Sequence, residues 1–480
     1  MSQAAAAPRE TAGATSGPWS VPLGNLLFAL ALLLFCGASV ALLATRYFAF
    51  SWLPTAALAL FLLLYRLPEL GYWMIVFLIP FGGFRKIEGP VSLNLPWILA
   101  SVLGMVITIQ LLPGKAVPPS LRSGIWRWLL PWFSLSLISA AMSDFPQTAF
   151  LNVGYLMASY LFMGLGMILL TEESICTTLP AVLVTSVSLS SLLAVLGYFL
   201  NIPLLAEKHG ELLVRGVGGA IDPNNMSLMI LFALPFLVHA LLWSAGWGMK
   251  LLSAALIAVN LLGIVTTYSR GGAVMLAVTL ILLAIAHRRL LTPRNVGLMV
   301  AIAGLGLAAF LLLLPVAYWE RQATLLDWAD TALERRASYL EVGAEAALAN
   351  PVLGAGPGTF REIYSSSQQA DRLVKISHTR RRFAHNTYLE VLVGTGVLGL
   401  FLFLGALVHA WRCLGTAIGR LDANRDAATA SIARSWRIAF LVVVLYLLIF
   451  SDVYHKYLLL ALAVAPIAAR LEPRVRERAA

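Results

Sequence analysis

The sequence predicts an all-α, polytopic transmembrane helical bundle with about 12 to 14 spans, and two observations lead to this prediction. Of the 480 residues, 60% are hydrophobic and only 12% are charged, whereas about a quarter of the residues in a soluble domain are charged. Apolar runs also recur along the whole chain, and about 20 apolar helical residues cross a bilayer core. A chain this apolar cannot cover itself with polar surface in water, so we expect lipid to be its solvent.

The apolar runs divide the chain into five parts. We expect a cytoplasmic tail at 1–20, an N-terminal transmembrane bundle at 21–317, an extramembrane loop containing helices at 318–385, C-terminal transmembrane helices at 386–470 and a cytoplasmic tail at 471–480. The expected spans are 21–44, 48–65, 69–82, 94–112, 125–142, 148–170, 178–200, 225–243, 250–268, 271–287, 294–317, 386–411, 437–451 and 456–470. Some of these runs are short for a span, which leaves about twelve spans as an alternative.

The positions of Lys and Arg set the expected orientation, because these residues gather at the cytoplasmic ends of spans. The basic segments are 287–294, 412–437 and 470–478. Placing all of them in the cytoplasm leaves four polar segments on the opposite side, at 84–90, 201–224, 268–271 and 318–385. Topology therefore accounts for the net charge of +11. No basic stretch is interleaved with exposed aromatics, so nucleic-acid binding is not expected.

Arg215 is the first candidate for chemistry. It opens the stretch RGVGGAIDPNN, whose glycines leave backbone N–H groups free to approach a ligand. Asp222 and Asn224 stand at the start of the next span and are suited to cap it. The alternative is that Arg215 is an arginine whose side chain reaches from the membrane interface into water.

Arg270 is the second candidate, in the stretch YSRGG between two apolar runs. An arginine so close to a span is costly without a partner. Together with the start of the following helix, its guanidinium would make a favourable anion site. The alternative is an anchor for lipid phosphates.

His385 is the third candidate, where the long loop re-enters the membrane in the stretch AHNTYLEVLVGTG. A neutral imidazole can take a proton from a hydroxyl group near pH 7. Asn386 can cap the helix that follows, and Tyr388 lies in its first turn. The alternative is an interfacial histidine without a chemical role.

Two further basic patches could attract an anion. One precedes the histidine and includes Arg382, although at least one of the three arginines at 380–382 is expected to be only a solvated basic residue. The other consists of Arg85 and Lys86, which could hold a phosphate or anchor their loop.

Several familiar sites have no counterpart in the sequence. The external segments contain no Asp-x-Asp pair to hold a divalent metal on a pyrophosphate, and the chain has no Walker-type loop. The three cysteines do not form a disulfide framework or a metal-binding spacing. We therefore expect no metal and no cofactor, and a metal-free reaction on an anionic, membrane-embedded substrate.

Four stretches together resemble the O-antigen ligase family, within the wider group of O-antigen ligases and polymerases. They are RGVGGAIDPNN, YSRGG, ANPVLGAGPGTF in the long loop and HNTYLEVLVGTGVLG after it, and they occur in the family's order between about 215 and 399. The first departs from the family's Asn-Pro-Asn pattern, with Asp-Pro-Asn in its place. The first half of the chain is similar to the family only in topology.

The resemblance implies a fold, a reaction and roles for residues. Members of this family are glycosyltransferases of the bacterial inner membrane with a helical fold similar to that of the GT-C glycosyltransferases. They transfer polysaccharide from undecaprenyl pyrophosphate to the lipid A–core oligosaccharide on the periplasmic face, without a metal and with inversion as the expected stereochemistry. By this resemblance Arg215 and Arg270 would bind the pyrophosphate, and His385 would act as the base on the acceptor hydroxyl.

Three other functions remain open. An O-antigen polymerase would use the same donor with a lipid-linked acceptor, and a protein O-oligosaccharyltransferase would use a protein. A transporter of lipid-linked glycans belongs to another class, and it would carry ionisable residues in the middle of several spans. Here the charged residues lie mostly at the ends of the apolar runs, which favours an enzyme.

Overall fold

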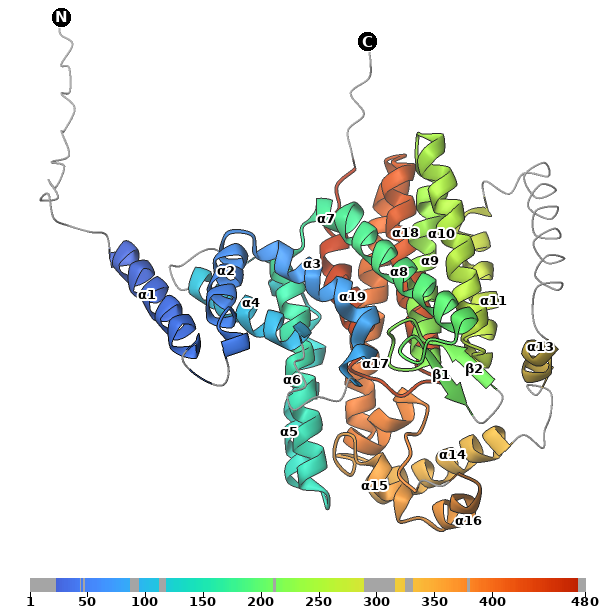
Figure 1. Ribbon diagram of the computed structural model, residues 1–480. Helices are drawn as coiled ribbons and strands as arrows, with labels where there is room; N and C mark the ends of the chain where they lie inside the picture. Colours follow the sequence, from blue (N-terminus) through green and yellow to red (C-terminus); the bar gives the residue numbers. More distant parts are fainter. Residues whose placement is uncertain are drawn as a thin grey trace, which may run out of the picture. The chain divides into compact units, whose positions relative to one another are not determined.

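The structure is a computed structural model that describes residues 23–43, 45, 48–86, 95–111, 118–209, 213–288, 316–323, 331–377 and 380–473. It divides the chain into two compact units, Met1–Pro68 and Glu69–Ala480. Nearly all regular structure in the described part is helical (Figure 1), as the composition predicts.

The first unit contains α1 (Leu23–Leu43), the short 3-10 helix η1 (Phe48–Phe50) and α2 (Leu53–Arg66). A proline lies in the first turn of α2, where its missing N–H leaves no hydrogen bond unmade.

The second unit holds the remaining elements and all candidate residues of the site. Its helices are α3 (Pro68–Leu78), η2 (Ile79–Lys86), α4 (Leu95–Leu111), η3 (Pro119–Arg122), α5 (Trp126–Ala141), α6 (Pro146–Leu169), α7 (Glu172–Cys176), α8 (Thr178–Leu200), α9 (Pro223–Trp243), α10 (Trp247–Thr266), α11 (Arg270–Ala286), α13 (Val316–Ala323), α14 (Thr331–Ala349), α15 (Phe360–Ser365), α16 (Gln368–Ser377), α17 (Thr387–Ala423), α18 (Ala427–Tyr446) and α19 (Lys456–Ala468). Two strands, β1 (Ala206–His209) and β2 (Leu213–Gly216), form an antiparallel hairpin between α8 and α9.

The described part contains seven helices that are long and apolar enough to cross a membrane, and four shorter apolar helices accompany them. These helices make the chain a multi-pass membrane protein, in agreement with the predicted fold class. The expected span at 294–317 lies almost entirely outside the described residues, so the total of about 12 to 14 spans stays a prediction.

Some boundaries differ from the sequence prediction. α17 continues to Ala423, twelve residues beyond the apolar run at 386–411, and α18 already begins at Ala427. Both helices therefore extend into the segment expected to be a basic loop, because Ala-rich, charged sequence is a good helix former that the search for apolar runs overlooks. The hairpin β1–β2 was also not expected. The segment 318–385, which was expected to contain helices, includes α14, α15 and α16.

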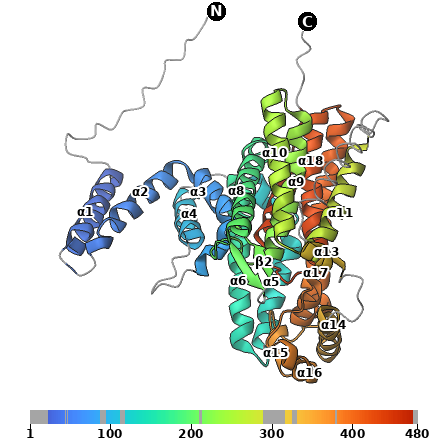
Figure 2. The same cartoon turned by 45° about the vertical axis from the view of Figure 1, so that its right-hand side comes forward.

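The core of the bundle lies around α9, which packs against α8, α10 and α18. Figures 1 and 2 both place α9, α10 and α18 side by side. Phe232 and Phe236 of α9 meet Trp436 of α18, and Phe232 also stacks on Tyr457 of α19 with ring centroids 4.6 Å apart. Such buried aromatic pairs hold the segment 223–243 and the C-terminal helices in one rigid group.

The glycine-rich stretch of the long loop is docked against a break in α17. At Gly396 the backbone of α17 has a positive φ of 65° and leaves the helical conformation. The loop fills this break, since Ala355 N–H donates to Val393 O at 2.8 Å and Gly356 N–H donates to Gly394 O at 3.1 Å. A Cβ atom at Gly354 would lie 2.5 Å from the backbone of α17. The glycines are therefore needed for close approach of two backbones.

Candidate functional site

Arg215 lies in β2 and is held beside the turn between α10 and α11. Only 7% of its surface is exposed, and its Nε donates a hydrogen bond to Thr267 O at 2.7 Å. In the hairpin it stands opposite Glu207. The small sheet that the sequence prediction missed is thus the element that carries this arginine and fixes its direction.

Arg270 is the first residue of α11, and this helix begins beside the start of α9. Ser269 caps α11 by accepting a hydrogen bond from Gly272 N–H at 3.0 Å, and its hydroxyl donates to Asn224 Oδ1 at 2.7 Å. Asp222 caps α9 by accepting from the N–H groups of Asn224 and Asn225. Two helix N-termini therefore lie side by side, and their partial positive charges add to those of the nearby arginines.

The turn that precedes Arg270 is strained. Tyr268 has a positive φ of 50°, which is unfavourable for a side chain of this size. Its hydroxyl hydrogen-bonds to the hydroxyl of Tyr198 at 2.8 Å, and its ring packs edge-on against Tyr318 of α13. Strained backbone of this kind persists only where the surrounding structure holds it, and it is common at functional sites.

His385 shows the same feature. Its φ is 49°, and neighbouring groups brace the backbone on both sides. Ala384 N–H donates to Glu390 Oε1 at 2.9 Å, and Asn386 N–H donates to Ser451 Oγ at 3.2 Å. Asn386 Oδ1 also accepts from Leu389 N–H and caps α17, as its position in the sequence predicts.

The turn between α18 and α19 connects the histidine with the two helix N-termini. Thr387 N–H donates to Leu447 O at 2.9 Å, which fixes the start of α17 to this turn. At the end of α18, the hydroxyl of Tyr446 donates to Asn224 O at 2.9 Å. A Cβ atom at Gly271 would lie 2.7 Å from Ile449 Cδ1, so the start of α11 also touches this turn. The two candidate regions, more than 100 residues apart in the chain, are therefore connected through one turn.

One arginine of the long loop acts on groups of both regions. The hydroxyl of Tyr446 interacts electrostatically with both Arg215 and Arg336, and Arg336 also acts on His385. Arg336 belongs to α14, whose Tyr339 ring packs on the imidazole of His385 with ring centroids 5.9 Å apart.

The environment of His385 keeps its ring neutral. The residue is exposed at the surface, yet the protein around the ring removes enough hydration to disfavour the charged form. This desolvation, together with the positive charges of Arg336, Arg382 and Arg335, lowers the pKa of His385 to about 4. The imidazole is accordingly unprotonated at neutral pH and able to accept a proton.

The supporting residues named from sequence have different positions. Tyr388 donates its hydroxyl to Val444 O at 2.7 Å and joins α17 to α18. Asn224 accepts from Ser269 and links the two helix N-termini. The positive charge of Arg382 acts on His385 and lowers the pKa of its imidazole. Arg85 and Lys86 end η2, and their side chains lie outside the described part of the structure.

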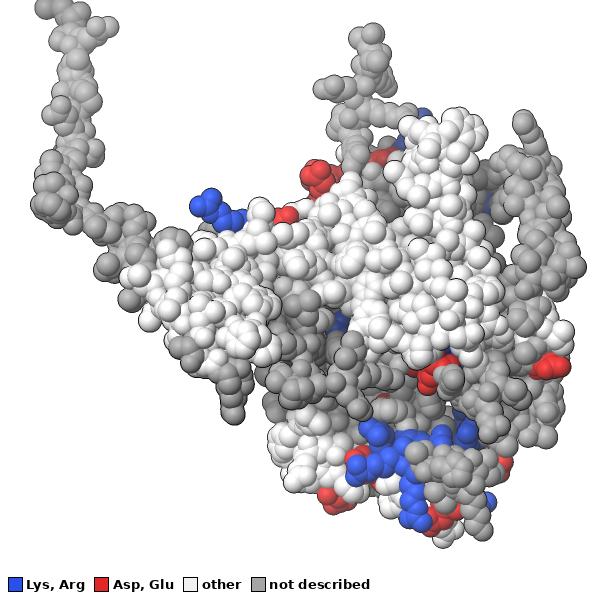
Figure 3. All heavy atoms as spheres, in the orientation of Figure 1, with Lys and Arg blue, Asp and Glu red and all other residues white. Residues whose placement is uncertain are grey.

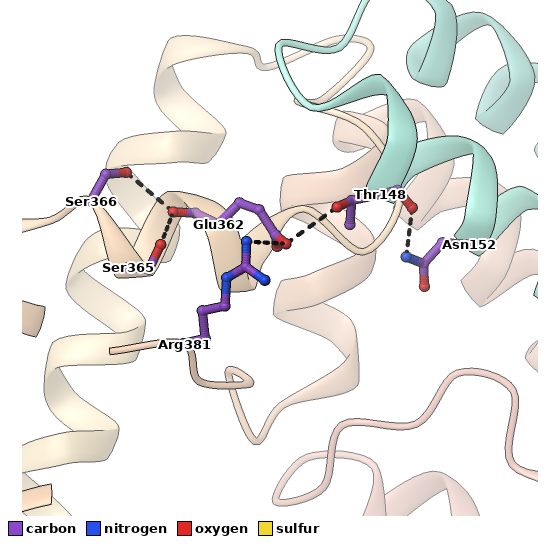
Figure 4. A network of polar contacts seen from close by, with 6 residues as sticks. All are labelled: Thr148, Asn152, Glu362, Ser365, Ser366 and Arg381. Carbon is purple, nitrogen blue, oxygen red and sulfur yellow. Dashed lines mark hydrogen bonds and ion pairs between the residues drawn. The ribbon is translucent and has the colours of Figure 1, made fainter. Parts of the chain in front are cut away.

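The other two arginines before the histidine are engaged elsewhere. Arg380 pairs with Asp371 at 2.7 Å, and both side chains are more than half exposed. Arg381 lies 3.6 Å from Glu362 Oε1, and Thr148 Oγ1 of α6 donates to the same oxygen at 3.2 Å (Figure 4). This network fastens the loop helix α15 to the start of α6, so Arg381 has a structural contact.

Sequence reasoning missed five polar groups near the site. Two are Arg335 and Arg336, which look like ordinary residues of a polar helix. Their position one turn before the aromatic Tyr339 was the signal that could have identified them. The other three are Glu390, Asp452 and His455. Burial raises the pKa of Asp452 to about 6 and lowers the pKa of His455 to about 3.

The charge distribution separates a basic region from an apolar one. On the face shown in Figure 3, Lys and Arg side chains gather over the helices α14–α16, whereas the described surface of the bundle carries little charge. Among the residues whose positions are described, no group of three or more His, Cys, Asp or Glu side chains could hold a metal ion. The groups suited to bind an anion here are the arginines and the N-termini of α9 and α11.

Comparison with known proteins agrees with the resemblance seen in the sequence. No curated protein matches the chain. A family model, however, matches from the middle of α10 into α17, a stretch that includes Arg270, α14, the glycine-rich loop and His385. Residues 254–404 match the model Wzy_C, described as O-antigen ligase, so this part of the chain is similar to the O-antigen ligase family.

Proposed function

We propose that this protein is an O-antigen ligase that transfers polysaccharide from undecaprenyl pyrophosphate to lipid A–core oligosaccharide. The reaction takes place on the periplasmic face of the bacterial inner membrane, with inversion at the anomeric carbon and without a metal. The family match supports an activity of the ligase or polymerase type. The observation that supports the mechanism is the single turn, between α18 and α19, that joins a neutral histidine to two helix N-termini and their arginines.

The donor pyrophosphate would lie at Arg215, Arg270 and the N-termini of α9 and α11. As the bond from the anomeric carbon to the pyrophosphate oxygen breaks, negative charge develops on the leaving group. Guanidinium groups that are already fixed stabilise this charge without reorganisation. Arg215 meets this requirement because it is buried and its Nε is held by Thr267.

The acceptor hydroxyl would react beside His385. Its oxygen forms the new bond to the anomeric carbon, its proton passes to the imidazole, and undecaprenyl pyrophosphate leaves with the electron pair of the broken bond. General-base assistance of this kind contributes on the order of 10²- to 10⁴-fold to the rate. Without bound substrate, His385 has a pKa of about 4 and is a weak base. Bound anions would offset the charges of the neighbouring arginines and raise that pKa.

The test is transfer by the purified protein in detergent with a chelator present. Undecaprenyl-pyrophosphate-linked glycan and lipid A–core are supplied, and the mass of the core lipid is followed on a gel. We expect transfer by the wild type and its loss in Arg270→Ala and His385→Ala. Arg380→Ala is the matched control, because this exposed arginine pairs with Asp371. Thermal unfolding of each variant shows whether it is folded.

The other outcomes identify the competing functions. Lengthening of the glycan on its own lipid carrier would identify a polymerase, and transfer to an added protein acceptor would identify a protein O-oligosaccharyltransferase. An intact donor with no product from a folded wild-type protein would refute the proposed reaction and favour transport of the lipid-linked glycan.

A further inference from the structure

We propose that Arg335, Arg336 and Arg382 form a second anion-binding site, which takes phosphate groups on the glycolipid acceptor. This site is distinct from the donor site at Arg215 and Arg270, and its assignment to the acceptor depends on the function proposed above. It belongs to the loop helices and lies beside His385.

Packing places the three arginines around the histidine. Arg335 and Arg336 precede Tyr339 by four and three residues, so the three side chains lie on one face of α14. The Tyr339 ring packs on the His385 ring, with centroids 5.9 Å apart and an angle of 36° between the planes. This face of α14 is therefore turned toward His385. Arg382 approaches from the loop immediately before the histidine.

A second contact shows on which side of the histidine these charges lie. The hydroxyl of Tyr364 in α15 hydrogen-bonds with Ser338 Oγ at 2.9 Å, and its ring packs on Tyr339. Both Arg335 and Arg382 act electrostatically on this hydroxyl. These two arginines therefore lie toward α15. Arg336 also acts on Tyr446, on which Arg215 acts as well, so within the proposed site it is the arginine that also influences the donor region.

Two acidic residues of α14 lie along a different surface. Glu334 and Glu341 line a hollow against α16 together with Gln369 and Arg372. Arg380 and Arg381 have acidic partners of their own. The charges that face His385 from α14 and from its own loop are thus all positive. The guanidinium fork matches the geometry of phosphate oxygens, so a cluster of arginines beside the histidine suits a phosphate group.

The position relative to the reaction favours the acceptor as the source of the phosphate. In an inverting transfer the nucleophile approaches from the side opposite the leaving group. With the leaving pyrophosphate at Arg215 and Arg270, the acceptor must enter on the far side of His385. Arg335 and Arg382, which act on Tyr364 of α15, would be on that side. Headgroups of bulk anionic lipids have the same chemistry, and the experiment must separate the two sources.

The experiment compares a phosphorylated lipid A–core acceptor with the same acceptor after enzymatic dephosphorylation. Steady-state transfer is measured for the wild type, Arg335→Ala, Arg382→Ala and Arg336→Ala, with Arg380→Ala as the control. For Arg335→Ala and Arg382→Ala we expect KM for the phosphorylated acceptor to rise about tenfold or more, with little change in KM for the donor. Arg336→Ala should raise KM for both substrates.

The dephosphorylated acceptor provides the decisive comparison. With it, wild type and the two variants should have similar, high KM values, because the interaction is already absent. Equal behaviour of the variants and the control on both acceptors would overturn the proposal. Repeating the measurement in phosphatidylcholine and phosphatidylglycerol nanodiscs identifies the source of the anion. A defect that follows the bulk lipid and ignores acceptor phosphate would also overturn it.

Binding without turnover separates this inference from the proposed function. His385→Ala protein is titrated with fluorescently labelled phosphorylated acceptor, with and without the additional substitution Arg335→Ala. Loss of affinity of about tenfold on removal of Arg335 supports the site even if no transfer is ever observed. Unchanged affinity refutes the site even if the protein proves to be a ligase.

Discussion

The acid side of the pH–activity profile is a direct test of the environment found for His385. At donor and acceptor concentrations well below their KM values, the transfer rate reports the ionisation of the free enzyme. The base must be neutral, so activity is lost as pH falls through the histidine pKa. Because desolvation and three arginines lower that pKa to about 4, about 97% of the imidazole is neutral at pH 5.5. An ordinary histidine, with a pKa of about 6.5, would be only about 9% neutral at this pH.

At pH 5.5, kcat/KM should therefore stay close to its plateau, whereas with a histidine of ordinary pKa it would lie about tenfold below the plateau. The assay is transfer to the core lipid at pH 4.5 to 8 in detergent, with donor binding measured at each pH as a control. The charged groups that face the ring are Arg335 and Arg336 on α14 and Arg382 on its own loop. Removing positive charge favours protonation, so Arg335→Gln and Arg382→Gln should move the acid limb to higher pH.

Bound substrate should act in the same direction as these substitutions. The anionic donor offsets arginine charge, and the acid limb of kcat should therefore lie at higher pH than that of kcat/KM. A wild-type limb near pH 6.5 that neither substitution moves would refute the reasoning, because burial and the arginines would then have no influence on the base.

Three further predictions concern the supports of the site. Arg215→Lys keeps the charge but loses the Nε hydrogen bond and the guanidinium fork, so kcat/KM should fall about 10- to 100-fold; full activity would show that charge alone suffices. Glu390→Ala removes the acceptor of the buried N–H that precedes the histidine and should cost about 1–3 kcal/mol of stability as well as activity. Glu390→Gln keeps an acceptor oxygen and should retain both, and equal loss in the two variants would contradict this. Gly356→Ala, at a φ of +111°, should lower the thermal unfolding temperature, whereas Gly154→Ala in open space should not.

The sequence by itself determined the class of fold and the residue types of the site. Runs of apolar residues identify most of the long helices because bilayer crossing depends on local composition and length. Helix caps are local too, and Asn386 is found as the predicted cap of α17. The candidate arginines and the histidine were recognisable because polar groups at span ends stand out against an apolar background. The extensions of α17 and α18 were missed because that signal disappears in charged, Ala-rich helix.

Only the tertiary structure decided which of these residues share a site. Arg215 depends on a short hairpin whose strands have no apolar alternation to reveal them. Arg335 and Arg336 look like ordinary residues of a polar helix until α14 packs against α17 and turns one face toward His385. The turn between α18 and α19 joins segments more than 200 residues apart, from Asn224 to Tyr446. Such contacts arise from the packing of whole helices and the closure of long loops, and no local pattern in a single chain encodes them.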